Sequence, residues 1–199
     1  MAEMRDPRLV AWIDALVATP GLTAIRDPAE AWREHVERAL EVVPVLERFG
    51  ASIVDVGSGG GSPGIPLAVA LPDREVTLLE AQERKAAFLE RWAAEFPNVR
   101  VVRGRAEEQP TDAYEVAVAR ALAPPAVAAE WCLPLVAAGG AVVLYVGPSA
   151  EPARVQRVAN SVGGGTVEEL PGLLVIPKVA ATPAGFPRRP GAAKKRPLA

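Results

Sequence analysis

The stretch that decides the fold is Asp55-Val56-Gly57-Ser58-Gly59-Gly60-Gly61-Ser62-Pro63-Gly64. The apolar run of residues 53–56 that ends inside it predicts a buried strand, and the apolar run of residues 65–71 that follows it predicts a helix. Glycines let a backbone approach a ligand closely, and the start of a helix offers N–H groups that lack partners. The sequence therefore predicts a strand, a ligand-binding turn and a helix in direct succession.

Two classes of ligand compete for this turn. Gly59-x-Gly61-x-x-Gly64 matches the dinucleotide fingerprint by letter, which would indicate a nicotinamide-dependent oxidoreductase. With Asp55 two residues before its first glycine, the turn also resembles motif I of class I methyltransferases, which bind S-adenosylmethionine. A carboxylate suits that ammonium- and sulfonium-bearing ligand and would repel a pyrophosphate. A plain turn without ligand is the simpler alternative, but five glycines within residues 57–64 exceed what one turn needs.

A second acid stands at the end of the next predicted strand, residues 75–80. Glu80 lies about 20 residues past the glycines, the spacing at which a carboxylate reaches the ribose hydroxyls of a bound nucleoside. Both cofactor classes need this acid, so Glu80 supports a nucleoside cradle without choosing between them. A solvated glutamate at a strand end is the simpler alternative.

The composition indicates an ordinary globular protein. The chain has 199 residues, of which 50% are hydrophobic and 23% charged, so we expect a single domain and a monomer. With one cysteine, Cys132, and one histidine, His35, neither an internal disulfide nor a protein metal site is expected. A leader and an apolar run of 18 residues are both absent from the sequence, which favours a cytoplasmic location.

The remaining pattern alternates strands and helices. Helices are expected at residues 7–18 and from Asp27-Pro28 to about residue 49, kinked at Pro44, as an N-terminal helical cap of residues 1–50. Further strands are expected at 99–103 and 114–119, and a turn at Gly139-Gly140 leads into a fifth strand that ends at 146. Helices are expected at 82–95, 124–137 and 150–161, with a hairpin around Pro171-Gly172. The predicted core, residues 51–180, is a Rossmann-like α/β domain with a mostly parallel sheet and an antiparallel terminal hairpin.

The charge is distributed unevenly. The net charge is −2, but from residue 171 onward the chain has six cations and no acid, so residues 1–170 carry −8. This asymmetry indicates a basic tail, residues 181–199, that meets a polyanion such as RNA. The alternatives are a solvated terminus and a tail that folds back onto the acidic body. Because the cradle lies on earlier strands, we expect the tail not to affect cofactor binding.

Few side chains outside the cradle suggest catalytic chemistry. The sequence has no Ser/His/Asp set with a recognisable spacing, and the fourth predicted strand ends in Arg120-Ala-Leu-Ala123. A lone histidine such as His35 is usually structural. A methyl transfer to guanine N7 needs no general base, because that atom has a lone pair and no proton. Catalysis then reduces to positioning the ring and excluding water.

Over nearly its full length the chain resembles the RsmG/GidB family of bacterial 16S rRNA guanine-N7 methyltransferases. The matching stretches are Leu22-Thr-Ala-Ile25, Asp55-Val-Gly-Ser-Gly-x-Gly-x-Pro-Gly-Ile-Pro-Leu67, Lys85-x-x-Phe-Leu89, Gly104-Arg-Ala-Glu107, Ala119-Arg-Ala-Leu-Ala123 and Phe186-Pro-Arg-Arg-x-Gly191. The resemblance implies a class I methyltransferase fold, S-adenosylmethionine as cofactor, and 16S rRNA or the small ribosomal subunit as partner.

The resemblance also implies site residues. It carries cofactor contacts to Gly57, Ser62, Ala106, Glu107 and Arg120, with Arg120 a candidate positioning residue. The reasoning from the residues places four more in the same shell: Asp55, Gly59, Gly61 and Glu80. The basic tail supplies expected RNA contacts: Arg188, Arg189, Lys194, Lys195 and Arg196.

The chain departs from the family pattern at three places on the expected substrate side. Gly21 stands where the family usually has Asn, Arg38-Ala39 where it has Asp-Ser, and Val146-Gly147 where it has Lys-Gly. A diverged S-adenosylmethionine-binding relative, with another substrate or without catalysis, is therefore the alternative to an rRNA methyltransferase.

Overall fold

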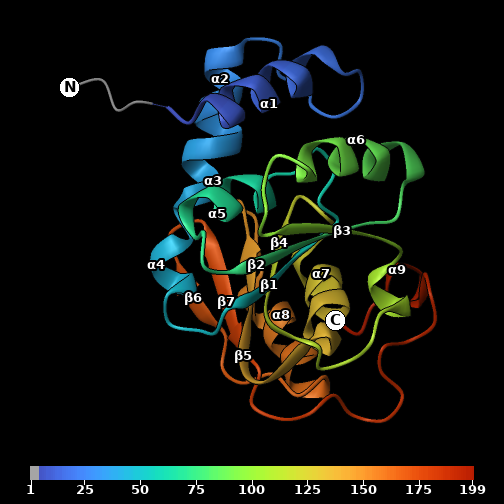
Figure 1. Ribbon diagram of the computed structural model, residues 1–199. Helices are drawn as coiled ribbons and strands as arrows, with labels where there is room; N and C mark the ends of the chain where they lie inside the picture. Colours follow the sequence, from blue (N-terminus) through green and yellow to red (C-terminus); the bar gives the residue numbers. More distant parts are fainter. Residues whose placement is uncertain (1–4) are drawn as a thin grey trace.

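A seven-stranded sheet with helices on both faces organises the computed structural model, which describes residues 5–199 (Figure 1). The strand order is β3-β2-β1-β4-β5-β7-β6. The first five strands are parallel, whereas β7 runs antiparallel to β5 and to β6. The predicted fold class is therefore confirmed. The strands are β1 (Ser52–Val56), β2 (Glu75–Glu80), β3 (Val99–Arg103), β4 (Tyr114–Arg120), β5 (Val136–Tyr145), β6 (Glu168–Leu170) and β7 (Leu173–Pro177).

Alternation along the strands divides the core between the two faces of the sheet. In β1, Ile53 packs on one face, while Val54 and Val56 pack on the other. The first face is covered by the N-terminal helices, α5 (Gly64–Ala70) and α6 (Glu83–Ala93). The second is covered by α7 (Pro125–Cys132), α8 (Pro152–Ser161) and the C-terminal helix α9 (Ala192–Lys195). Two short 3₁₀ turns complete this part of the chain: η2 (Ala106–Glu108) and η3 (Leu133–Leu135).

The two helices α1 and α2 begin at aspartate caps. Asp6 caps α1 (Pro7–Ala18), and the side chain of Asp27 accepts two backbone N–H bonds at the start of α2 (Pro28–Trp32). The expected single helix to residue 49 is wrong in detail, because it is broken into α2, a π-helical turn η1 (Arg33–Glu37), α3 (Arg38–Leu40) and α4 (Val43–Leu46). A proline fits only the first turn of a helix, so α4 restarts just before Pro44.

The fifth strand begins earlier than its glycines suggest. Gly139-Gly140 was expected to be a turn, but β5 runs through it, with a register irregularity against β4 between Tyr114 and Val116. A Cβ on Gly140 would lie 2.0 Å from the backbone oxygen of Glu115. Glycine is therefore needed for close strand approach here, not for a turn.

The strand order places a ligand crevice between β1 and β4. The crossover after β1 leads to β2 and the crossover after β4 leads to β5, in opposite directions along the sheet, so the loops that follow β1 and β4 diverge at their carboxyl ends. The glycine-rich loop follows β1 and Arg120 ends β4. Among residues 5–199, no helix is long and apolar enough to cross a membrane.

The close contact at Gly140 predicts a stability effect. Gly140→Ala should lower the free energy of unfolding by about 1–3 kcal/mol, because the added methyl group must displace the β4 backbone. Gly147→Ala is the matched control, since no atom lies within 4 Å of the Cβ position there. Urea denaturation of both variants measures the difference. Equal stability of the two would contradict the contact.

Candidate functional site

Two adjoining cavities open at the carboxyl ends of β1, β2 and β4. The first, about 350 Å³, is called the β2-side cavity, and the second, about 340 Å³, the cap-side cavity. Both are lined by Gly57, Lys85 and Ala121, so together they form one continuous cleft. The β2-side cavity is also lined by Glu80, Gln82, Ala106, Glu107, Leu122, Trp131 and Lys194, and the cap-side cavity by Glu34, His35, Gly59, Ser62 and Arg120.

The glycine-rich loop separates the two cavities. Gly57 has a φ of 74°, and a Cβ there would lie 2.4 Å from a methyl group of Leu122. Gly59 has a φ of 59°, and its Cβ would meet nothing closer than 3.8 Å, so it would enter the open cap-side cavity. The positive φ angles favour glycine at both positions. Only at Gly59, however, would an added side chain extend into the cavity where a ligand could bind.

The Glu80 carboxylate joins the ends of β1 and β2. One oxygen accepts a hydrogen bond from Gly59 N at 2.9 Å, and the other accepts one from Gln82 N at 2.7 Å. Glu80 is 5% exposed and lines the β2-side cavity. It is therefore a buried acid that holds the loop in shape and faces the expected nucleoside site, not a solvated strand end.

Asp55 lies elsewhere than expected. Its carboxyl group is 1% exposed, lines neither cavity, and accepts a bond from Gly64 N at 3.0 Å. Burial raises the pKa of Asp55 to about 7, against the lowering effect of that bond. The expectation that Asp55 faces the ligand is therefore wrong. Its carboxyl group instead fixes the start of α5. Gly61 also lies off the cavities, and a Cβ there would strike Ile65.

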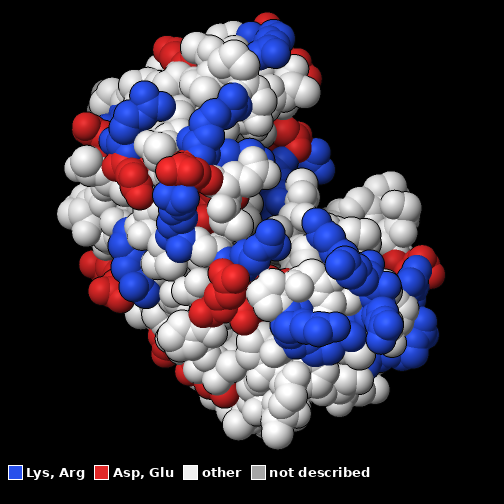
Figure 2. All heavy atoms as spheres, turned by 90° about the vertical axis from the view of Figure 1, so that its right-hand side faces the viewer, with Lys and Arg blue, Asp and Glu red and all other residues white. Residues whose placement is uncertain are grey.

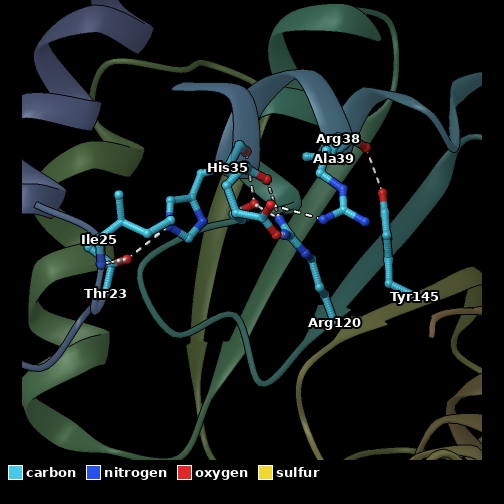
Figure 3. Close-up of polar contacts among 9 residues, drawn as sticks. Thr23, Ile25, His35, Arg38, Ala39, Arg120 and Tyr145 are labelled. Carbon is cyan, nitrogen blue, oxygen red and sulfur yellow. Dashed lines mark hydrogen bonds and ion pairs between the residues drawn. The ribbon is translucent and has the colours of Figure 1, made fainter. Parts of the chain in front are cut away.

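Arg120 links the sheet to the N-terminal helices (Figure 3). Its guanidinium donates to the backbone oxygen of Glu34 at 2.7 Å and to Ser62 Oγ at 3.2 Å, and forms an ion pair with the Glu34 carboxylate. Ser62 Oγ in turn donates to the His35 backbone oxygen at 2.9 Å. Arg38, at a departure from the family pattern, also pairs with Glu34.

The His35 ring is held by a neighbouring side chain. Its Nε2 lies 3.0 Å from Thr23 Oγ1 (Figure 3). Burial, followed by the positive charge of Arg120, lowers the pKa of His35. The ring therefore favours its neutral form at the wall of the cap-side cavity.

The structure adds cavity residues that sequence reasoning missed. Ala106 and Glu107 line the β2-side cavity as expected, but Gln82, Leu122 and Trp131 also line it. Lys85, quoted above only as part of a motif, reaches both cavities. Ala121 has a φ of 51°, which is rare for a residue with a side chain and typical of functional sites. The sequence signal for Trp131 was its size, because it is the one large aromatic residue among the small residues of α7.

The basic tail folds back onto the body. Two of the six cations from residue 171 onward serve the fold: Lys178 is buried and donates to Leu133 O at 2.8 Å, and Arg188 forms a two-bond ion pair with the buried Glu130. Arg188 is thus anchored to the body, as expected from the alternative in which the tail folds back onto the acidic body. The other four expected RNA contacts are exposed: Arg189, Lys194, Lys195 and Arg196. Lys194 nevertheless lines the β2-side cavity, so the tail does not lie apart from the cradle.

Comparison with known proteins identifies relatives over most of the chain. The family model GidB, described as rRNA small subunit methyltransferase G, matches residues 7–172. A protein named ribosomal RNA small subunit methyltransferase G from Moorella thermoacetica is 38% identical over 89% of this chain and 82% of its own length. One of the same name from Chloroflexus aggregans is 36% identical over 96% of this chain and 86% of its own length.

Solved structures share the fold at low sequence identity. The 16S rRNA N2 methyltransferase RsmC of T. thermophilus, solved with AdoMet and guanosine, superposes with a TM-score of 0.56 at 18% identity, over 83% of this chain and 42% of that chain. A geranyl diphosphate methyltransferase solved with sinefungin gives a TM-score of 0.54 at 17% identity, over 67% of this chain and 62% of its own. These likenesses support the class I methyltransferase fold.

The position of Glu80 predicts a large effect on cofactor binding. Glu80→Gln keeps the shape of the side chain but removes a charged acceptor, so affinity for S-adenosylhomocysteine should fall by about 1.5–3 kcal/mol, or roughly tenfold to 150-fold. Isothermal titration measures the change. Glu83→Gln is the control, because the Glu83 side chain is 76% exposed. A folded Glu80→Gln variant with wild-type affinity would refute the role.

Proposed function

Because the chain belongs to the rRNA small subunit methyltransferase G family, we propose that it transfers a methyl group from S-adenosylmethionine to N7 of a guanine in 16S (small-subunit) rRNA. One observation carries this proposal: the family match over residues 7–172 includes every residue of both cavities except Lys194. The shared sequence therefore coincides with the cleft.

The residues that line the cleft would hold the cofactor along its length. Glu80, Ala106 and Glu107, which line the β2-side cavity, would hold its nucleoside. Gly57, Gly59 and Ser62, which line the cap-side cavity, would hold its amino-acid part. When bound, the cofactor supplies a methyl group on a positively charged sulfur. The residues around it bind and orient it and exclude water.

The cap-side cavity suits a target atom that carries no proton. A lone pair at guanine N7 would accept the methyl group that the bound cofactor would supply. No proton is transferred, so no general base is required. The acid at this cavity, Glu34, is already paired with Arg120 and Arg38, and the His35 ring contacts Thr23. These groups position the N-terminal helices at the cavity mouth.

The exposed part of the tail supplies a surface for the RNA. Lys and Arg side chains gather on the face that carries the C-terminal segment (Figure 2). A hollow of about 570 Å³ in this segment is lined by Arg188, Arg189, Lys195 and Arg196. With Arg188 paired to Glu130, the other three offer their charges to phosphates, and Lys194 lies beside the cleft. Such contacts position a nucleic acid without reading its sequence.

Methylation of defined RNA tests the proposed function. Small ribosomal subunits, and rRNA extracted from them, are prepared from a strain lacking this gene and incubated with the protein and labelled S-adenosylmethionine. Nucleoside mass spectrometry should find the label in 7-methylguanosine of small-subunit rRNA. Label in another nucleoside would overturn N7 transfer. Cofactor binding without any labelling would favour the diverged relative without catalysis.

The salt dependence of RNA binding tests the tail. Arg189→Ala/Lys195→Ala should reduce the slope of log affinity against log salt by roughly 1.4, since each single-strand phosphate contact contributes about 0.7. The control, Arg33→Ala/Arg157→Ala, removes the same charge from exposed helix positions outside this hollow. If both double variants change the slope equally, only net charge matters and the tail surface is not the RNA site.

A further inference from the structure

The C-terminal segment returns to the wall of the β2-side cavity. Residues 186–196, here called the C-terminal hook, pack on α7 through Ala193, which is 1% exposed. Arg188 Nε and Nη2 donate to the two oxygens of Glu130 at 2.5 and 2.7 Å, and Glu130 is 3% exposed. The hook is therefore anchored on the helix that also carries Trp131.

Two further contacts join the hook to cavity residues. Glu107, which lines the cavity, accepts a hydrogen bond from Gly191 N at 3.0 Å. Lys194 lines the same cavity, and its Nζ lies 5.2 Å from the centre of the Trp131 ring. The hook thus forms part of the cavity and holds the indole from one side.

Trp131 has an unused donor. The residue is 9% exposed and lines the β2-side cavity, and its indole nitrogen has no hydrogen-bond partner among the described residues. Buried donors without an acceptor are rare, because burial without a partner costs free energy. An indole N–H can only donate. A ligand that satisfies this donor must bring an acceptor to the cavity wall, and the indole must turn to meet it, because the nitrogen itself is buried.

We propose that Trp131 is a specificity-determining residue for the cofactor base, donating its indole N–H to a ring nitrogen of adenine, and that the hook holds it in place. Adenine offers ring nitrogens as acceptors, whereas the ribose hydroxyls are served by the carboxylate at Glu80. The inference rests on the proposed function only for the identity of the cofactor. It makes the tail part of cofactor recognition, in addition to its RNA surface.

Cofactor analogues that lack single ring nitrogens test the contact. S-adenosylhomocysteine and its 1-deaza, 3-deaza and 7-deaza forms are titrated by calorimetry into the wild type and into Trp131→Phe. In the wild type, the analogue that lacks the ring nitrogen bonded by Trp131 should bind about tenfold more weakly than S-adenosylhomocysteine itself. In Trp131→Phe the two should bind equally, while the ratios for the other analogues stay unchanged.

A purely structural role would give a different pattern. Trp131→Phe would then weaken all four ligands by the same factor, and identical ratios in the two proteins would overturn the inference while leaving the proposed function intact. A wild type that binds none of them would overturn both. Replacement of Trp131 by benzothienylalanine, which exchanges N–H for sulfur in the same shape, gives the same test if the phenylalanine variant does not fold. Trp92→Phe on α6 is the control.

The role of the hook has its own measurement. Arg188→Ala removes the anchor on Glu130 and should weaken S-adenosylhomocysteine binding several-fold. It should also reduce the ratio between the affinity for S-adenosylhomocysteine and the affinity for the analogue that lacks the bonded ring nitrogen. Arg157→Ala, an exposed arginine on α8 outside both the cavity and the hook, is the control and should change neither. Wild-type affinity and ratios in a folded Arg188→Ala protein would show that the hook does not hold Trp131.

Discussion

The site depends on one buried carboxylate that joins two strand ends. Glu80 accepts N–H bonds from Gly59 and Gln82, so the loop after β1 and the turn after β2 are fixed relative to each other. Because this acid is almost fully buried, water cannot readily replace its bonds to the backbone N–H groups. Both cavities border on this junction, and the cleft keeps its shape only while the two strand ends stay together.

A second set of polar bonds closes the cleft from the N-terminal side. Arg120 at the end of β4 bonds to Glu34 and Ser62, and Ser62 bonds to the backbone of His35. Glu34 and His35 both lie in the π-helical turn η1, which interrupts the α-helical chain. The carboxyl ends of the strands therefore organise both the glycine loop and the N-terminal helices above it.

Much of this could be predicted from the sequence, because it follows from local rules. The glycine-rich turn, the acid at the end of β2 and the aspartate cap of α2 are all indicated by short sequence patterns. The orientation of Asp55 toward Gly64 and the choice of Glu130 as the partner of Arg188 could not be predicted, since they depend on packing between distant segments. Trp131 was missed for the same reason: only the folded chain shows that it lines the cavity with an unused donor.

Parallel calorimetric titrations of the wild-type protein with S-adenosylhomocysteine and with NAD test the central claim most directly. The cleft has no cationic side chain on the glycine loop itself for a pyrophosphate, and the family match favours a methyl donor. We predict one binding site per chain for S-adenosylhomocysteine and no measurable heat of binding for NAD. Saturable binding of NAD without binding of S-adenosylhomocysteine would contradict the account.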